Sequence, residues 1–190
     1  AGGDGTVNLV ATGLADGNRL SLPIAMIPVG TANILRKEFH LPRDPARIAD
    51  AIAARHTSNV DRCWLSAGPV QRPFLIMVSS GVDAMVVDRL AAKRGGTITK
   101  AAYVLPTLQV LLGARIEPVE VEVDGRVVCD RARLAVVANC RAYGAPWEMT
   151  SLADPADGLL EVLCVTLPVR LCVLPIVAAG AGRLCVMALL

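Results

Sequence analysis

Two glycine turns, each placed directly before a helical pattern, constrain the fold of this chain more than any other feature. The first turn reads GGDGT at residues 2–6, and the second reads GTAN at residues 30–33. The apolar run LPIAMIP, at residues 22–28, precedes the second turn and has the composition of a buried parallel strand. Strand, turn and helix in this order are typical of an α/β layer, so we expect one at the front of the chain.

Three helices are predicted in this front part. The first covers residues 6–14, with apolar residues near helical spacing and Gly13 close to its end. The second follows the GTAN turn, and Thr31 is its expected N-cap. The third begins after Asp44, a good N-cap residue, with Pro45 at the first helical position.

Strands dominate after about residue 59. Valines at 119, 121 and 123 alternate with acidic residues, and Asp124-Gly125 is a hairpin turn signal. Further strands are predicted at residues 73–80, 133–140 and 157–165. Helices are predicted at residues 83–93 and 99–113, with Pro106 as a kink or break.

This change of pattern divides the chain. We predict an α/β domain at residues 1–58, an antiparallel β-rich domain at residues 59–166, and a C-terminal segment at residues 167–190. The fold class is therefore α/β followed by β.

Composition excludes several classes of function. A net charge of +2 and an aromatic content of 3% argue against nucleic-acid binding. The six cysteines form no CxxC pair and lie far from the two histidines, so we expect reduced thiols and no zinc site. The charge-free run between Arg170 and Arg183 contains Pro175 and is shorter than the roughly 20 residues of a membrane span, so no transmembrane span is expected.

The two glycine turns are suited to hold phosphate groups. Glycine allows the backbone to approach a phosphate closely, and a helix N-terminus presents unpaired N–H groups with a partial positive charge. Two such turns on one sheet suit a nucleotide polyphosphate. The alternative interpretation is a pair of ordinary strand-to-helix turns.

Asp4 lies inside the first turn, where phosphates would repel it unless something compensates. A bound Mg²⁺ would do so. Alternatively, Asp4 accepts a proton from an incoming hydroxyl, or it has a turn or N-cap role. All three roles fit the sequence.

A third candidate site is the turn Asp157-Gly158, which enters an apolar strand in ADPADGLLEV at residues 153–162. Taken alone it also fits a plain loop. The sequence contains no GxxxxGK[ST], GxGxxG, HRD or DFG motif, which argues against P-loop, hydride-transfer and protein-kinase chemistry.

Five motifs occur in the order and approximate spacing of the diacylglycerol kinase catalytic domain superfamily, which the chain resembles from residue 1 to about residue 166. They read GGDGTVN, IPVGTAN, SSGVDA, GGTITKAAYVL and ADPADGLLEV. The resemblance implies a Rossmann-like, phosphofructokinase-like α/β nucleotide domain followed by an antiparallel β-sandwich. It places the active site in the cleft between them and packs the C-terminal segment back on the first domain.

The function implied by this resemblance is an ATP-dependent lipid kinase that uses Mg²⁺. It would transfer the γ-phosphate to a hydroxyl of diacylglycerol or a sphingoid-type lipid, in the cytoplasm at the membrane surface. There are two alternatives: a kinase for a soluble acceptor such as NAD, and a non-catalytic protein that binds a nucleotide or a lipid. A homodimer is left open as the oligomeric state.

Site residues carry over from the superfamily by motif. Asp157 matches the aspartate assigned as general base or as part of the Mg²⁺ network, whereas in sphingosine kinases the base is the GGDG aspartate, here Asp4. Asp83 in SGVDA lies near the acceptor-lipid region. The implied contacts to the ATP phosphates fall on Gly2, Gly3, Asp4, Gly5, Thr6, Gly30, Thr31 and Asn33.

The sequence departs from the family pattern at two positions. Leu9 stands where relatives carry glutamate, and Ile34 stands where GTAND has aspartate. The family also has a strand-helix-strand-helix-strand unit before GGDGT, so we expect residues 1–58 to be the later part of the nucleotide domain.

Overall fold

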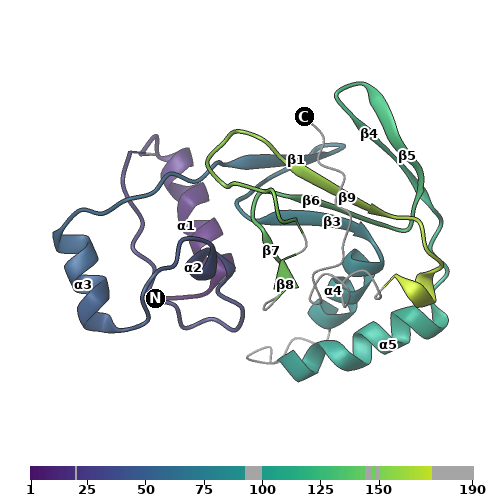
Figure 1. The fold of residues 1–190 in the computed structure, drawn as a ribbon, viewed down its shortest axis with the longest axis horizontal. Helices are drawn as coiled ribbons and strands as arrows, with labels where there is room; N and C mark the ends of the chain where they lie inside the picture. The colour runs from purple at the N-terminus through teal and green to yellow at the C-terminus, as the bar shows by residue number, and fades with distance from the viewer. Residues whose placement is uncertain (20, 93–99, 144–146, 149, 173–190) are drawn as a thin grey trace.

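The computed structural model describes residues 1–19, 21–92, 100–143, 147–148 and 150–172. A helical front part lies at the left of Figure 1, and a β-rich part with two helices beneath its central sheet lies at the right. The mixed α/β class, with antiparallel sheets in the second part, is confirmed.

The front part contains α1 (Asp4–Asp16), α2 (Ile34–Glu38) and α3 (Pro45–Ala53). The predicted start of α3 is confirmed, because the Asp44 carboxylate accepts a hydrogen bond from the Ala46 N–H at 3.0 Å. The N-cap prediction for α2 is wrong, since Asn33 and not Thr31 precedes the helix. Asn33 has a φ of 48°, a left-handed conformation that asparagine tolerates, and the chain becomes helical only after it.

The prediction of a buried parallel strand at residues 22–28 is also wrong. The segment makes one isolated parallel bridge, between Pro28 and Gly2, and Met26 is its one buried residue. A strand forms only where a neighbouring backbone satisfies its N–H and C=O groups along its length. Within the described residues, Gly2 is the one residue that pairs with this segment.

Four antiparallel sheets make up the β-rich part. The central sheet has the order β3 (Met77–Gly81), β6 (Leu134–Ala138), β9 (Glu161–Val165). The other sheets are three hairpin pairs: β1 (Cys63–Ala67) with β2 (Val70–Phe74), β4 (Val119–Val123) with β5 (Arg126–Ala132), and β7 (Ala142–Tyr143) with β8 (Trp147–Glu148). The predicted hairpin turn at Asp124-Gly125 is confirmed, and both residues have positive φ.

The strand predicted at residues 73–80 is two strands in different sheets. It is broken at Leu75 and Ile76, whose carbonyl groups accept hydrogen bonds from Asn139 and Cys140 and so leave the ladder. This break turns the chain from the β1–β2 hairpin into the central sheet.

Two helices cover one face of the central sheet: α4 (Val82–Ala92) and α5 (Val104–Gly113), which follows the 3₁₀ turn η1 (Lys100–Tyr103). Pro106 lies in the first turn of α5, which begins at Val104, so its missing N–H leaves no helical bond unmade. Val110 of α5 and Leu134 of β6 are completely buried in the core that these helices form with the sheet.

A second core joins the front part to the β-rich part. It contains Ile34 and Leu35 of α2, Met26, and two residues from the β-rich part, Leu75 and Cys140. The two parts are therefore connected by buried apolar contacts as well as by the chain.

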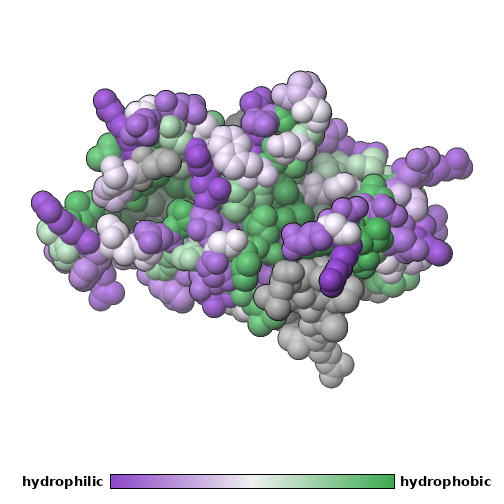
Figure 2. Space-filling view, turned by 90° about the horizontal axis from the view of Figure 1, so that it is seen from above, coloured by the Kyte–Doolittle hydropathy of each residue, from purple (hydrophilic) through white to green (hydrophobic). Residues whose placement is uncertain are grey.

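Apolar side chains are also exposed. The helix α1 buries no residue, and Leu9 on it is 73% exposed. Figure 2 shows hydrophobic side chains along the middle of one face, between hydrophilic groups at both ends. Among the described helices, none is long and apolar enough to cross a membrane.

The C-terminal segment predicted at residues 167–190 is described as far as residue 172. Its 3₁₀ turn η2 (Val169–Leu171) lies beside α5. The predicted packing of residues 173–190 on the first domain lies outside the described residues.

Candidate active site

The two glycine turns lie against each other, backbone to backbone. The Gly2 N–H donates to the Ile27 carbonyl at 3.0 Å, and the Val29 N–H donates to the Gly2 carbonyl at 3.4 Å. A Cβ atom on Gly30 would lie 2.5 Å from the Cα of Gly3. This approach leaves no room for a side chain on Gly30, so glycine is required there for packing.

The Asp4 carboxylate ties the first turn to α2. One oxygen accepts a hydrogen bond from the Ile34 N–H at 2.9 Å, and the other accepts from the Leu35 N–H at 3.0 Å. These are the first two N–H groups of α2, which have no partner within the helix. The two N–H groups at the start of α2 thus compensate the negative charge of Asp4.

Asn33 closes the second turn on itself. Its side-chain oxygen accepts from the Gly30 N–H at 3.1 Å, and its amide nitrogen donates to the Gly30 carbonyl at 2.6 Å. The side chain is buried and committed to this turn, so it shapes the turn and does not point a free group at a ligand.

Gly5, Thr6 and Thr31, from the two turns, are exposed. An added Cβ on Gly5 would meet no atom of the protein within 4 Å. Packing therefore does not require glycine at position 5, which distinguishes it from Gly30. The open space at Gly5, next to the start of α1, fits the approach of a phosphate group to the helix N-terminus.

Asp157 lies on an exposed loop that is held in place by Asp61. The Asp61 carboxylate accepts from the Gly158 N–H at 2.7 Å, and the Asp61 N–H donates to the Pro155 carbonyl at 2.7 Å. One Asp157 oxygen accepts from the Leu159 N–H at 2.9 Å, which leaves the other oxygen for a ligand.

Asp83, at the start of α4, lies in a separate cluster. The Ser79 hydroxyl donates to one carboxylate oxygen at 2.5 Å, and the Tyr143 hydroxyl donates to the other. Burial raises the pKa of Tyr143, and the charge of Asp83 raises it further. The tyrosine therefore remains a protonated donor across the physiological range of pH.

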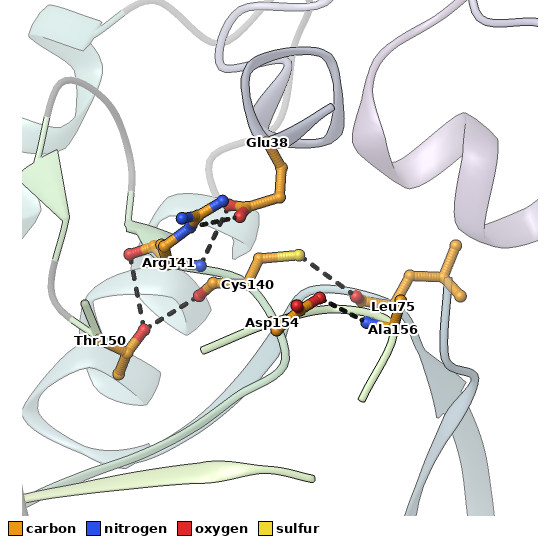
Figure 3. A network of polar contacts seen from close by, with 7 residues as sticks. All are labelled: Glu38, Leu75, Cys140, Arg141, Thr150, Asp154 and Ala156. Atoms are coloured by element: carbon orange, nitrogen blue, oxygen red, sulfur yellow. Dashed lines mark hydrogen bonds and ion pairs between the residues drawn. The ribbon is translucent and has the colours of Figure 1, made fainter. Parts of the chain in front are cut away.

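A polar network connects α2 with the segment that follows β6 (Figure 3). Arg141 donates to the Glu38 carboxylate from its Nε at 2.8 Å and from its backbone N–H at 3.1 Å. The Glu38 side chain is only 2% exposed. Thr150 donates its hydroxyl to the Cys140 carbonyl at 3.0 Å. The network thus fixes α2 to the segment that follows β6.

Cys140 lies where these groups meet. Burial raises the pKa of its thiol to about 12, and the nearby negative charges of Glu38 and Asp4 act in the same direction. Ile34 and Leu35, at the start of α2, lie in the same buried cluster as Cys140.

The predicted site residues therefore fall into three groups. The structure brings the two glycine turns together through Asp4. Among the described residues, Asp157 and Asp83 share no hydrogen bond with Asp4 or with each other, and each is held by its own neighbours.

Sequence reasoning missed the residues that hold these groups, which are Asp61, Glu38, Arg141, Asn139 and Thr150. Glu38 had one readable signal, because it is a charged residue four positions after the apolar Ile34, on the same face of α2. Asp61, Asn139 and Arg141 make contacts over 64 or more positions of sequence, which local patterns do not encode.

The described residues contain no group of three His, Cys, Asp or Glu side chains that could hold a metal by themselves. Mg²⁺ in kinase sites is commonly held by one or two carboxylates together with substrate phosphates and water. The exposed Asp157, with one oxygen available, fits that arrangement.

Comparisons with known proteins agree on one family. The diacylglycerol kinase catalytic domain matches residues 1–65, and the YegS C-terminal NAD kinase beta sandwich-like domain matches residues 76–181. Diacylglycerol kinases from Mycobacterium tuberculosis and Bacillus subtilis are 30% and 28% identical, over 85% and 86% of this chain. The crystal structure of a diacylglycerol kinase from Bacillus anthracis superposes with a TM-score of 0.66 at 26% identity, covering 96% of this chain and 57% of that one. The chain spans about half the length of the curated relatives, 52% in both cases.

We expect Asp4→Asn to destabilise the fold by about 1–2 kcal/mol, because an amide offers one acceptor oxygen and turns its NH₂ group toward the second helix N–H. Urea unfolding followed by circular dichroism measures this. Asp16→Asn, at the exposed C-terminal end of α1, is the matched control and should not lower the midpoint, because a negative charge there does not stabilise the helix. An unchanged midpoint for Asp4→Asn would remove the capping role.

Glu161, the first residue of β9, should make stability depend on pH. Burial raises the pKa of its carboxyl group, the Asp157 charge adds to this, and the backbone N–H groups of Leu152 and Ala153 oppose it. The stabilisation from the neutral form is fully present below the unfolded pKa and is lost as pH rises through the folded pKa. Glu161→Gln should therefore gain stability relative to the original protein between pH 5 and pH 8. If the unfolding free energies of Glu161→Gln and the original protein differed by the same amount at pH 5 and at pH 8, this prediction would be contradicted.

Proposed function

Since the chain belongs to the diacylglycerol kinase family, we propose that it forms the phosphate-binding and acceptor-side parts of an ATP-dependent lipid kinase. The observation that carries the proposal is the pair of glycine turns joined by Asp4, with open space at Gly5. We also propose the division into residues 1–58, 59–166 and 167–190, which agrees with the change from helices to antiparallel sheets near β1.

We propose that the ATP phosphates lie along the joined turns. The exposed Gly5, Thr6 and Thr31 supply backbone and hydroxyl groups there, while Gly2, Gly3, Gly30 and Asn33 shape the backbone. Phosphoryl transfer depends mainly on positioning and charge stabilisation, and N–H groups at a helix N-terminus provide both. When bound, Mg²⁺ would neutralise phosphate charge, and Asp157 would hold it as an alternative to the general-base role argued next.

Asp157 is also a better candidate than Asp4 for the general base. Both Asp4 oxygens accept hydrogen bonds from α2, and protonation would weaken at least one of these bonds. Asp157 is exposed on a loop that Asp61 holds, so it can accept a proton from a lipid hydroxyl without breaking the fold. In the transfer step, the lipid hydroxyl oxygen bonds to the γ-phosphorus, ADP leaves, and the hydroxyl proton passes to Asp157.

We propose that Asp83 orients the polar end of the acceptor lipid through its cluster with Ser79 and Tyr143. Two hydroxyl donors hold the carboxylate fixed in direction. The acceptor would be diacylglycerol or a sphingoid-type lipid, presented at the cytoplasmic membrane surface.

A second candidate is nucleotide binding without transfer. Leu9 favours it, because this side chain is 73% exposed on α1 and has no charge with which to organise a ligand. Transfer assays separate the two candidates.

Gly5→Ala should weaken ATP binding while leaving the fold intact. The added methyl group meets no protein atom within 4 Å, and alanine favours a helix over glycine by about 1 kcal/mol. Isothermal titration with ATP–Mg²⁺ should show affinity reduced about tenfold or more, as one lost charge-assisted contact implies. Gly13→Ala, at an equally open position of α1, is the matched control. Equal ATP affinity in both variants would exclude Gly5 from the nucleotide site.

Asp157→Asn should reduce transfer of labelled γ-phosphate from ATP to diacylglycerol in mixed micelles by about 100-fold or more, the usual contribution of a general base. Asp154→Asn, in the same loop, keeps an acceptor oxygen for the Ala156 N–H and should transfer normally. Full activity of Asp157→Asn would remove Asp157 from the mechanism. Phosphorylation of NAD but of no lipid would overturn the proposed acceptor class.

A further inference from the structure

The apolar face of α5 has no role in the site described above. Four of its side chains point away from the core and are 48–71% exposed: Val104, Leu105, Leu108 and Leu112. Residues spaced by three and four positions share one face of a helix, and these four follow that spacing. Pro106 and Val110 on the opposite face are buried. The helix therefore covers the core with one face and exposes leucines on the other.

Two arginines lie beside this face. A cavity of about 330 Å³ is lined by the end of α5, from Leu111 to Gly113, together with Arg115, Val169 and Arg170. Arg115 and Arg170 are exposed, and neither forms an ion pair with any residue that the structure describes. Their positive charges are available to an external group.

The charge pattern of the sequence is one-sided in the same region. Residues 89–116 contain five Lys or Arg residues and no Asp or Glu, although the whole chain is nearly balanced at 19 basic and 17 acidic residues. The nearest acids along the chain are Asp88 and Glu117, both exposed. By sequence, the segment between them therefore carries positive charge without neighbouring acids to balance it.

The position of α5 suits contact with a flat surface. In Figure 1, α5 runs along the outer edge of the molecule, on the side of α4 away from the front helices, and η2 lies beside its end. Exposed leucines next to arginines are the composition of helices that lie in the headgroup region of an anionic bilayer.

We propose that α5, with Arg115 and Arg170, is the surface by which this chain docks on an anionic lipid bilayer. Leu105, Leu108 and Leu112 enter the acyl boundary, and the two arginines contact lipid phosphates. The biological purpose rests on the proposed lipid-kinase function, because an acceptor lipid must be taken from a membrane. Docking itself requires neither ATP nor turnover.

Sedimentation with sucrose-loaded vesicles tests the docking surface. The 190-residue chain is mixed with vesicles of phosphatidylglycerol and phosphatidylcholine, or of phosphatidylcholine alone, without nucleotide. We expect binding to the anionic vesicles to be at least tenfold tighter. Arg115→Gln/Arg170→Gln should weaken it about 25-fold, at about fivefold for each basic residue. Leu108→Ser/Leu112→Ser should weaken it at least tenfold.

Arg47→Gln/Ile52→Ser is the matched control, because it removes one exposed arginine and one exposed apolar residue from α3, at the other end of the molecule. It should bind as the original chain does. Equal binding by the α5 variants, or no preference for anionic vesicles, would overturn the proposal. Analytical ultracentrifugation gives a further test. The proposal would be overturned if the original chain were a dimer that does not bind vesicles and Leu108→Ser/Leu112→Ser made it a monomer, since the exposed face of α5 would then be a contact between copies.

Activity measurements keep this proposal distinct from the proposed kinase function. With diacylglycerol in vesicles, the α5 variants should lose transfer, and with a short-chain, water-soluble diacylglycerol they should match the original chain. A chain that binds vesicles through α5 but transfers no phosphate would contradict the kinase function and leave docking supported. Loss of transfer with both substrates would contradict a role limited to docking.

Discussion

The hydrogen bonds from the first two N–H groups of α2 to the Asp4 carboxylate are the interaction on which the front of this molecule depends. They compensate a negative charge inside a glycine turn and satisfy two helix donors at once. Because Gly3 and Gly30 also meet with almost no space between their backbones, the two turns behave as one unit. The N-terminus of α1 is thereby presented beside the second turn.

This unit is fixed to the β-rich part at its other end. Ile34 and Leu35, whose N–H groups bind Asp4, place their side chains in the core that contains Leu75 and Cys140. One turn later, the buried carboxylate of Glu38 forms an ion pair with the partly exposed Arg141. A buried carboxylate without its partner is costly, so this pair constrains how α2 lies against the strands. The geometry of the two glycine turns and of the β-rich part is therefore coupled through one short helix.

The sequence predicted best what local chemistry determines. The cap of α3 at Asp44 and the hairpin at Asp124-Gly125 depend on neighbouring residues, and both were correct. Residues 22–28 looked like a buried strand, but a strand also needs paired neighbours, and Gly2 alone pairs with the segment among the described residues. In the candidate site, the pairing of the two glycine turns was predictable from their motifs. The contact of Glu38 with Arg141 was not, because 103 positions separate the two residues.

Amide hydrogen exchange with and without ATP–Mg²⁺ tests most directly the claim that the two turns form one nucleotide site. The account predicts that ATP slows exchange at residues 2–6 and at residues 30–35 together and with the same concentration dependence. Asp4→Asn should weaken the protection of both segments in parallel. Protection of one turn without the other, or ATP-dependent protection confined to other parts of the chain, would contradict the account.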